Sequence, residues 1–111
     1  MTNKEFFEFL SKQGKEAKYA VDYTTEFKKN VKSCFKRNLD LQLLADVILK
    51  LARAEKLDEK YCVHKFHGIA KQHNEDIWEC HIQPDWLLIW KPNDNDLILI
   101  LSNSGTHSDL F

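Results

Sequence analysis

The chain has little of what flexible linkers, disulfide frameworks and membrane spans require. It contains three glycines and two prolines in 111 residues, which leaves little room for linkers and predicts a single domain over 1–111. Its three cysteines are odd in number and widely spaced, which favours reduced thiols over disulfides. The longest strongly apolar runs, at 86–90 and 97–101, are too short to cross a bilayer. We therefore expect a cytoplasmic protein without a membrane partner.

The chain also has no large excess of either charge sign, and arginine is rare in it. The net charge is −1, which gives the chain no overall attraction for nucleic acid, and Arg37 and Arg53 are its only arginines. One short stretch is nevertheless basic. It contains Lys28, Lys29, Lys32, Lys36 and Arg37. This cluster fits either a solvated helix face or a surface that binds RNA or the ribosome.

Hydrophobic periodicity predicts a small α+β fold. Helical spacing of apolar residues recurs in 3–12, in a segment that Thr24 or Thr25 begins and that extends to about residue 37, and in 40–54. Alternation predicts strands at 18–23, 77–82, 86–91 and 97–102, and the last of these is apolar on both faces, as in a central strand. The order β-α-α-β-β-β predicts helices packed on a mostly antiparallel sheet, preceded by an N-terminal extension at 1–16.

Two of the predicted helices have a well-defined apolar stripe that we expect to face the core. The stripes consist of Phe27, Val31, Cys34 and Phe35 in the first and Leu43, Leu44, Val47, Ile48 and Leu51 in the second. Trp86 and Trp90 are likewise expected in the core rather than on a surface that stacks on bases.

Histidines are the residues most suggestive of chemistry, because imidazole both takes and gives a proton near neutral pH. The chain has five, at His64, His67, His73, His81 and His107. One interpretation is a metal site made of His64, His67 and either Glu79 or His81, but the first two lie in a predicted loop and lack the HExxH helix. No phosphate-binding loop, dinucleotide fingerprint or nucleophile elbow offers another catalytic pattern.

His81 and His107 stand out because the predicted hairpin brings both toward one rim of the sheet. His81 lies near the end of a strand on its polar face, and His107 follows a Gly-Thr turn after the central strand. Asp85 lies at the turn between the predicted strands 77–82 and 86–91. There it either forms the turn after Pro84 or orients an imidazole. Two imidazoles at one rim suit acid–base cleavage of a phosphodiester.

Three motifs carry a resemblance to a known family. They are Tyr61-Cys-Val-His64, then Glu79-Cys-His81-Ile-Gln-Pro84-Asp85-Trp86, and finally Gly105-Thr106-His107-Ser-Asp-Leu110-Phe111. In this order and spacing, from about residue 19 to residue 111, the chain resembles the YafQ branch of the RelE toxins. The resemblance implies a compact α+β domain that cleaves mRNA, typically on the ribosome, and that a cognate antitoxin silences.

The resemblance also implies an active site and a mechanism without metal or cofactor. The site would be lined by His64, Glu79, His81, Asp85, His107 and Phe111. His81 or Asp85 would help to remove the proton from the ribose 2′-OH, and His107 would protonate the leaving 5′-oxygen. Phe111 would stack on or position a base. Which histidine is the acid and which the base is left open by the sequence.

The chain departs from the family pattern at three points. Relatives often carry an arginine where this chain has Trp78 and another where it has Asn103, and a preorganised cation is a large catalytic term. Relatives that bind ribosomes are commonly basic. Residues 1–16 have no counterpart in the usual short toxin and are a structural cap, an antitoxin-like self-inhibitory segment or a wrongly assigned start. The alternative function is therefore a nuclease-impaired RelE-fold protein that acts by binding an antitoxin or another protein.

Overall fold

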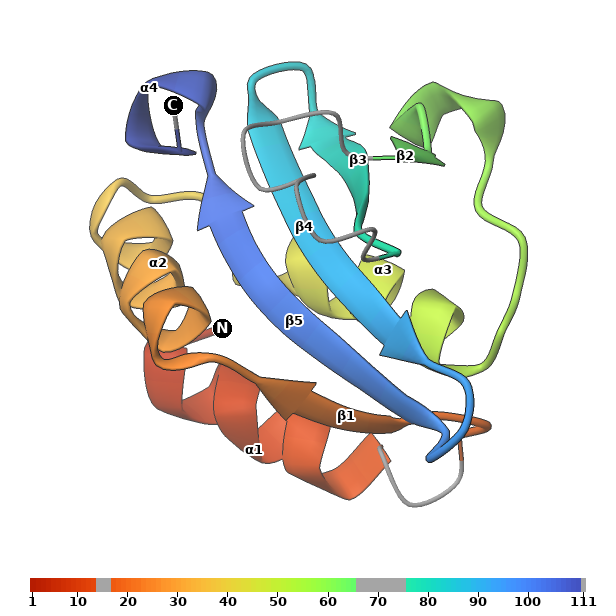
Figure 1. Ribbon diagram of the computed structural model, residues 1–111. Coiled ribbons are helices and arrows are strands. Elements are labelled where there is room, and N and C mark those ends of the chain that lie inside the picture. Colours follow the sequence, from red (N-terminus) through yellow and green to blue (C-terminus); the bar gives the residue numbers. More distant parts are fainter. Residues whose placement is uncertain (14–16, 66–75, 111) are drawn as a thin grey trace.

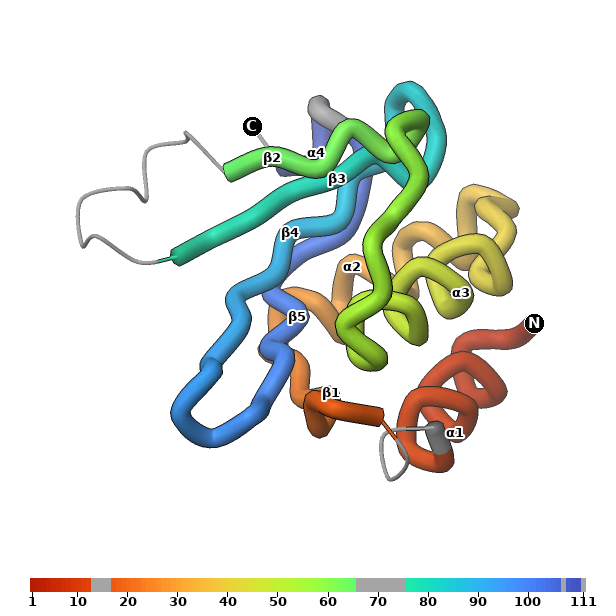
Figure 2. The backbone as a smooth tube through the Cα atoms, turned by 90° about the vertical axis from the view of Figure 1, so that its right-hand side faces the viewer, coloured from red at the N-terminus to blue at the C-terminus, as the bar shows by residue number. Residues whose placement is uncertain are grey.

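A five-stranded mixed sheet with helices on one face organises the computed structural model, which describes residues 1–13, 17–65 and 76–110 (Figure 1; Figure 2). The elements are α1 (Asn3–Gln13), β1 (Ala20–Tyr23), α2 (Thr25–Lys36), α3 (Leu41–Ala52), the short 3-10 helix η1 (Glu59–Tyr61), β2 (His64–Lys65), β3 (Trp78–Gln83), β4 (Trp86–Asn93), β5 (Ile98–Gly105) and α4 (His107–Leu110). The strand order is β1-β5-β4-β3-β2, in which β1 is parallel to β5 and the other pairs are antiparallel. The predicted fold class is confirmed.

Helix α2 begins and ends at residues with the local chemistry that helix ends require. The Thr24 hydroxyl oxygen accepts a hydrogen bond from the Phe27 amide at 3.0 Å and donates one to the Ser102 carbonyl at 2.7 Å. The cap therefore ties the start of α2 to β5. Beyond the last turn Asn38 has a φ of 62°, the left-handed conformation that ends helices.

The apolar stripe of α2 is only partly buried. Phe27, Val31 and Cys34 are in the core, but Phe35 is 41% exposed, so its predicted place in the core is wrong. At about 100° per residue, Phe35 lies about 80° around the helix from Phe27, at the flank of the stripe rather than at its centre. It also lies in the last turn of the helix.

Helix α3, like α2, has a capping residue at its start and one exposed residue in its predicted apolar stripe. Asp40 caps it, since its carboxylate accepts a hydrogen bond from the Gln42 amide at 3.0 Å. Leu44 and Ile48 are fully buried, whereas Leu43 is 37% exposed and does not belong to the core as predicted. The side chain of Leu43 instead lines a surface pocket between α3 and β3.

The N-terminal helix α1 is an integral part of the packing. Thr2 and Glu5 exchange side-chain-to-amide hydrogen bonds at its start, which is a capping box. Phe6 is fully buried and Leu10 is 5% exposed, and α1 contacts α2 and α3. In both views α1 lies at the end of the molecule away from α4 and the β3–β4 turn (Figure 1; Figure 2). Helix α1 therefore packs against α2 and α3 at a distance from the turn between β3 and β4.

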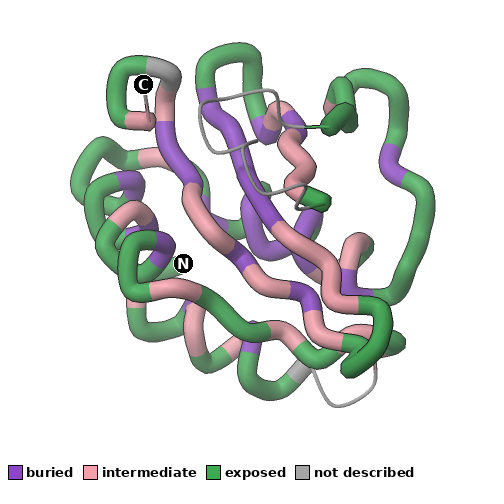
Figure 3. The backbone as a smooth tube through the Cα atoms, viewed as in Figure 1, coloured by how far each residue is buried: buried purple, intermediate pink, exposed green. Residues whose placement is uncertain are grey.

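Strands β4 and β5 form the buried centre of the sheet (Figure 3). Trp86 and Trp90 are buried in the core as predicted, at 1% and 5% exposure. The Trp86 indole N–H donates to the Ser104 hydroxyl oxygen at 3.0 Å, and that hydroxyl donates to the Leu87 carbonyl at 2.9 Å. A buried serine thus links the two strands at the end where the candidate site lies. Among the described helices, none is long and apolar enough to cross a membrane.

Candidate active site

Strand register brings the sequence motifs together at one end of the sheet. His81 on β3 pairs with Leu87 on β4, and Leu87 pairs in turn with Gly105 at the end of β5. His64 on β2 pairs with Glu79 on β3. Since residues two apart on a strand share a face and lie roughly 7 Å apart, Glu79 and His81 line the same face side by side. The register therefore places His64 and Glu79 next to His81 on neighbouring strands.

His64 and Glu79 form the most tightly bonded pair of the site. The ring Nδ1 of His64 is 2.7 Å from the Cys62 carbonyl oxygen, and because that oxygen can only accept, Nδ1 must donate. The ring Nε2 is 2.5 Å from a carboxylate oxygen of Glu79, whose side chain is 15% exposed. A proton must therefore lie between Nε2 and the carboxylate, in a charge-assisted hydrogen bond. His64 lies in the short strand β2, so its predicted place in a loop is wrong.

His81 is oriented by the turn that follows its strand. Pro84 and Asp85 form a tight two-residue turn between β3 and β4. The ring Nδ1 of His81 lies 3.2 Å from the Pro84 carbonyl and donates to it, so that Nε2 carries the lone pair in the neutral ring. The turn thus selects one tautomer of the imidazole, which is the form in which Nε2 accepts a proton. Asp85 lies at this turn, as predicted, and its side chain is exposed.

The segment that carries His107 is held by a second capping box. The carboxylate of Asp109 accepts from the Thr106 amide at 3.1 Å, and the Thr106 hydroxyl oxygen accepts from the Asp109 amide at 3.2 Å. Arg37, at the end of α2, donates to the same carboxylate at 2.8 Å. A Cβ on Gly105 would lie 3.1 Å from Asp109, so the glycine allows this close approach. Residues 106–110 are therefore attached to α2.

The surroundings of Asp109 favour its ionised carboxylate. The hydrogen bond from the Thr106 amide lowers the pKa of Asp109 from its ordinary value, and Arg37 adds to the lowering while burial opposes it. The Arg37 guanidinium is half-exposed and paired with Asp109. Its predicted role in binding RNA or the ribosome therefore competes with a structural one.

The other predicted residues are placed as follows. The side chain of His107 and the whole of Phe111 lie outside the described residues, as do His67 and His73. Lys28, Lys29, Lys32 and Lys36 are all exposed along α2, and α2 ends beside α4 (Figure 1). Glu26 lies 3.9 Å from the Lys29 ammonium. The basic cluster is thus a solvated helix face that remains accessible to a polyanion.

Sequence reasoning missed three residues that support the site. Asp109 follows Thr106 by three positions, and this Thr-x-x-Asp spacing is a capping signal that was readable in the sequence. Asn30 accepts from the Ser104 amide at 3.1 Å and from the Asn103 side chain at 3.2 Å, where β5 continues beyond β1. No sequence periodicity marks Asn30 or Ser104, because their partners lie on distant elements.

The three cysteines differ in their surroundings. Cys34 and Cys80 are buried, and burial raises the pKa of their thiols to about 11 and about 12. Cys62 is exposed and ends η1 in the left-handed conformation. Cys80 faces the core while His81 is half-exposed, in keeping with their adjacent positions on one strand.

A metal site receives no support from the described side chains. In residues 1–13, 17–65 and 76–110, no three histidine, cysteine or acidic side chains are grouped so as to hold a metal ion. His64 and Glu79 meet each other, and His67 lies outside the described residues.

Several solved structures with this fold are bacterial toxins. A metal-bound toxin from Helicobacter pylori has a TM-score of 0.74 and 34% sequence identity, over 82% of this chain and 97% of that one. The YafQ toxin in the DinJ–YafQ toxin–antitoxin complex of Escherichia coli has a TM-score of 0.72 and 29% identity, over 85% and 98% of the two chains. Fold and site together therefore define the class as a small α+β toxin of the RelE type.

Sequence comparison narrows the class to one family. The mRNA interferase toxin YafQ of Escherichia coli K12 is 30% identical over 92 residues, which are 82% of this chain and 94% of that protein. The family model for YafQ, a bacterial toxin of type II toxin–antitoxin systems, matches residues 19–111. The chain belongs to the YafQ toxin family. Helix α1 precedes the matched region.

Proposed function

We propose that this chain is the toxin of a cytoplasmic type II toxin–antitoxin pair and cleaves mRNA as an endoribonuclease. The observation that carries the proposal is the register that sets His81 and the start of the His107 segment on either side of Leu87, within motifs that match the family over 19–111. A relative at 30% identity is named an mRNA interferase, and another has been solved with its antitoxin DinJ.

The proposed reaction is a transesterification without metal or cofactor. His81, through Nε2, or Asp85 removes the proton from the ribose 2′-OH. The 2′-oxygen attacks the adjacent phosphorus in line, and the bond to the 5′-oxygen breaks while His107 gives that oxygen a proton. The products are a 2′,3′-cyclic phosphate and a free 5′-OH. Phe111 stacks on or positions a base.

His64 and Glu79 are proposed as the third part of the active site. Glu79 pairs with His64 and precedes His81 by two residues, roughly 7 Å along β3. A charge-assisted pair at this distance orients His64 toward the phosphodiester and keeps its ring fixed, since Cys62 holds the other nitrogen.

The proposed partners follow from the family and from the charge of α2. The antitoxin is a protein that covers the site, and the substrate is mRNA on the ribosome. The exposed lysines of α2, with Arg37 at its end, supply the cationic surface for RNA or ribosome binding, although the net charge is −1.

Induction in a bacterial host tests the function directly. The wild type is compared with the His81→Ala/His107→Ala double variant, and mRNA 5′-ends are mapped by primer extension. We expect new cuts and growth arrest with the wild type alone, and cleavage by purified protein that persists in EDTA. Cleavage lost in EDTA would replace the proposal with a metal-dependent hydrolase.

The binding-protein alternative has one structural observation in its favour. The two positions where relatives often carry arginine hold side chains with structural partners. Trp78 donates to Asp76 at 2.9 Å, and Asn103 donates to Asn30 at 3.2 Å. If folded wild type binds its antitoxin but cuts no mRNA, on or off the ribosome, the chain is a nuclease-impaired binding protein.

A further inference from the structure

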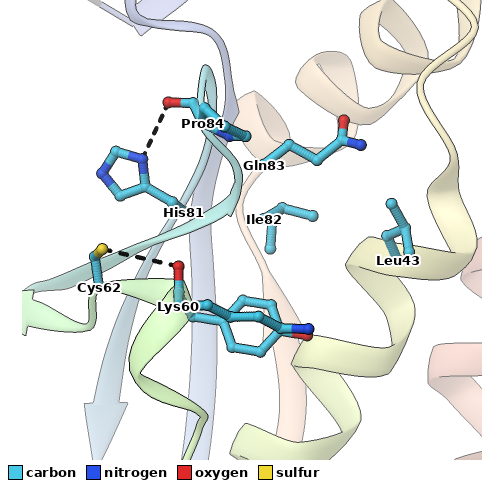
Figure 4. A pocket seen from close by; sticks show the side chains of 8 residues that line it. Leu43, Lys60, Cys62, His81, Ile82, Gln83 and Pro84 are labelled. Carbon is cyan, nitrogen blue, oxygen red and sulfur yellow. Dashed lines mark hydrogen bonds between the residues drawn. The ribbon is translucent and has the colours of Figure 1, made fainter.

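A surface pocket extends from His81 to Leu43 (Figure 4). It has a volume of about 640 Å³, within the roughly 300–1,000 Å³ typical of sites for small ligands. In the close-up His81 and Leu43 stand at opposite ends, with Pro84 at the turn above and Lys60 below. Strand pairing of β3 with β2 ends at Glu79, and η1 borders the remaining edge of β3. The pocket is therefore continuous with the candidate active site.

The walls of the pocket are mainly apolar. Tyr61 of η1 is half-buried, and Ile82 of β3 and Leu43 of α3 complete the inner surface with 8% and 37% exposure. Pro84 adds an exposed ring at the turn. An aromatic ring beside aliphatic groups is the surface on which nucleobases stack, because every base has a π-face.

The polar groups of the pocket suit a nucleotide rather than a cation. The Lys60 ammonium lies over the Tyr61 ring, 5.2 Å from its centre. A base that stacks on this face takes the place of the ammonium, and the flexible lysine side chain then binds the neighbouring phosphate. The exposed Gln83 amide offers both a donor and an acceptor to a base edge. Among the described residues that line this pocket, none carries a carboxylate. Three other pockets of the described residues each include at least one carboxylate, such as Glu8 or Asp58.

We propose that this pocket is a nucleotide subsite that holds the RNA base next to the scissile phosphate. The base stacks on Tyr61, Lys60 binds the neighbouring phosphate, and Gln83 contacts the base edge and biases which base is accepted. This inference rests on the proposed ribonuclease function and adds to it a source of sequence preference. An RNA occupant is favoured over a peptide of the antitoxin because His81 belongs to both the pocket and the proposed reaction, and because the polar lining is cationic or neutral.

Four single variants and one matched control test the subsite. Tyr61→Ala removes the ring, and Tyr61→Phe keeps it. Lys60→Ala and Gln83→Ala change exposed side chains, so they leave the core intact. Lys56→Ala removes the same charge as Lys60→Ala from the neighbouring pocket that Asp58 also lines. Cleavage of a single-stranded RNA is followed for rate, for KM and for the base frequencies on either side of each cut.

We expect Tyr61→Ala to lower kcat/KM about tenfold or more, the range of one lost base stack, and Tyr61→Phe to restore it. Lys60→Ala should raise KM several-fold, while Lys56→Ala leaves it unchanged. Gln83→Ala should alter the base frequencies at one position beside the cut. Thermal unfolding of the Lys60 and Gln83 variants should match that of the wild type, which separates these effects from folding.

Cys62, which lines the pocket, gives a second measurement that needs no catalysis. Alkylation of Cys62 is timed with and without an RNA oligonucleotide whose scissile nucleotide is 2′-deoxy and cannot react. We expect RNA to slow the alkylation in the wild type and in Lys56→Ala, and to slow it much less in Tyr61→Ala.

The outcomes separate the subsite from the function on which it rests. A wild type that never cuts RNA overturns the ribonuclease function. A wild type that cuts, with pocket variants that keep its rate and base frequencies, overturns the subsite alone. The subsite is also overturned if these variants cut normally but lose binding to the cognate antitoxin, because the pocket would then be a protein-binding surface.

Discussion

The two corners of the candidate active site are built in different ways. At the first corner, adjacent strands set His64 against Glu79, and both ring nitrogens of His64 have partners within 2.7 Å. At the second, the segment that carries His107 leaves the sheet and is held by Asp109, which Arg37 contacts from α2. Strand pairing fixes the first corner, whereas side chains from distant parts of the sequence fix the second.

Two kinds of contact therefore hold the same rim of the sheet: strand pairing at the first corner and side-chain contacts at the second. A change at the first corner should alter chemistry with little loss of stability, because the sheet register remains. A change at the second corner should alter stability and the position of the His107 segment together.

Glu79→Gln should have the largest effect, and on cleavage rather than folding. The amide cannot share the proton that lies between the carboxylate and His64 Nε2, so we expect cleavage to fall about 100-fold, or about 2.7 kcal/mol. Single-turnover cleavage of RNA and thermal unfolding are measured on the same preparation. Glu55→Gln, an exposed change outside the site, is the control. Cleavage within twofold of the wild type would remove Glu79 from the active site.

Ser104→Ala should have the largest effect on stability. Its hydroxyl accepts from Trp86 and donates to the Leu87 carbonyl inside the core, so alanine leaves the indole N–H buried without its partner. We expect unfolding free energy to fall by about 1–3 kcal/mol in urea titration. Ser33→Ala, on the exposed face of α2, serves as the matched change and should be nearly neutral. Equal stability of the two variants would show that Ser104 does not support the second corner.

The contrast between the corners also explains which parts were readable from the sequence. Helices α2 and α3 were predicted because caps and apolar spacing are local, as Thr24 and Asp40 show. His81 and Asp85 were located because a strand and a tight turn fix their direction. Short β2 was missed, since two residues carry no alternation to detect. Arg37 was assigned to RNA because its partner is 72 residues away and leaves no periodic trace.

Leu43 shows a second limit of periodicity. Its spacing is that of a core residue, but helical spacing does not say how far the covering element extends. Leu43 is 37% exposed, because no other element of the described residues packs over its side chain. The side chain instead lines the pocket that η1 and β3 border.

Arg37→Ala and Asp109→Ala should give intermediate effects that are not additive. Each removes the contact between α2 and the His107 segment, so we expect about tenfold slower cleavage, while the exposed pair itself contributes less than about 1 kcal/mol to stability. Asp109→Ala should be the more severe, because it also removes the cap on Thr106. Arg53→Ala removes the chain's other arginine as a control. If the double variant were as slow as the product of the two single effects, the two residues would act independently.

The pH dependence of this corner has a definite sign. Because the folded state lowers the pKa of Asp109 below its ordinary value of 3.8, the ionised carboxylate stabilises the fold above that value, and the contribution is lost as the pH falls through the lowered pKa. The stability difference between wild type and Asp109→Asn should therefore be constant near neutral pH and shrink below about pH 4. A difference that grows on acidification would contradict the assignment.

The rates of thiol labelling should reveal the smallest free-energy differences, and they report on both corners at once. Cys62 is exposed beside His64, whereas Cys34 is buried with its sulfur 3.9 Å from the Ser104 carbonyl and its pKa raised to about 11. Native wild type should therefore take up one iodoacetamide by mass spectrometry, on Cys62, and Cys62→Ser should take up none in the same time. In Ser104→Ala, Cys34 should label faster because the second corner opens more often, while the labelling rate of Cys62 stays unchanged. If the rates of Cys62 and Cys34 rise together, the two corners share one support and the contrast between them fails.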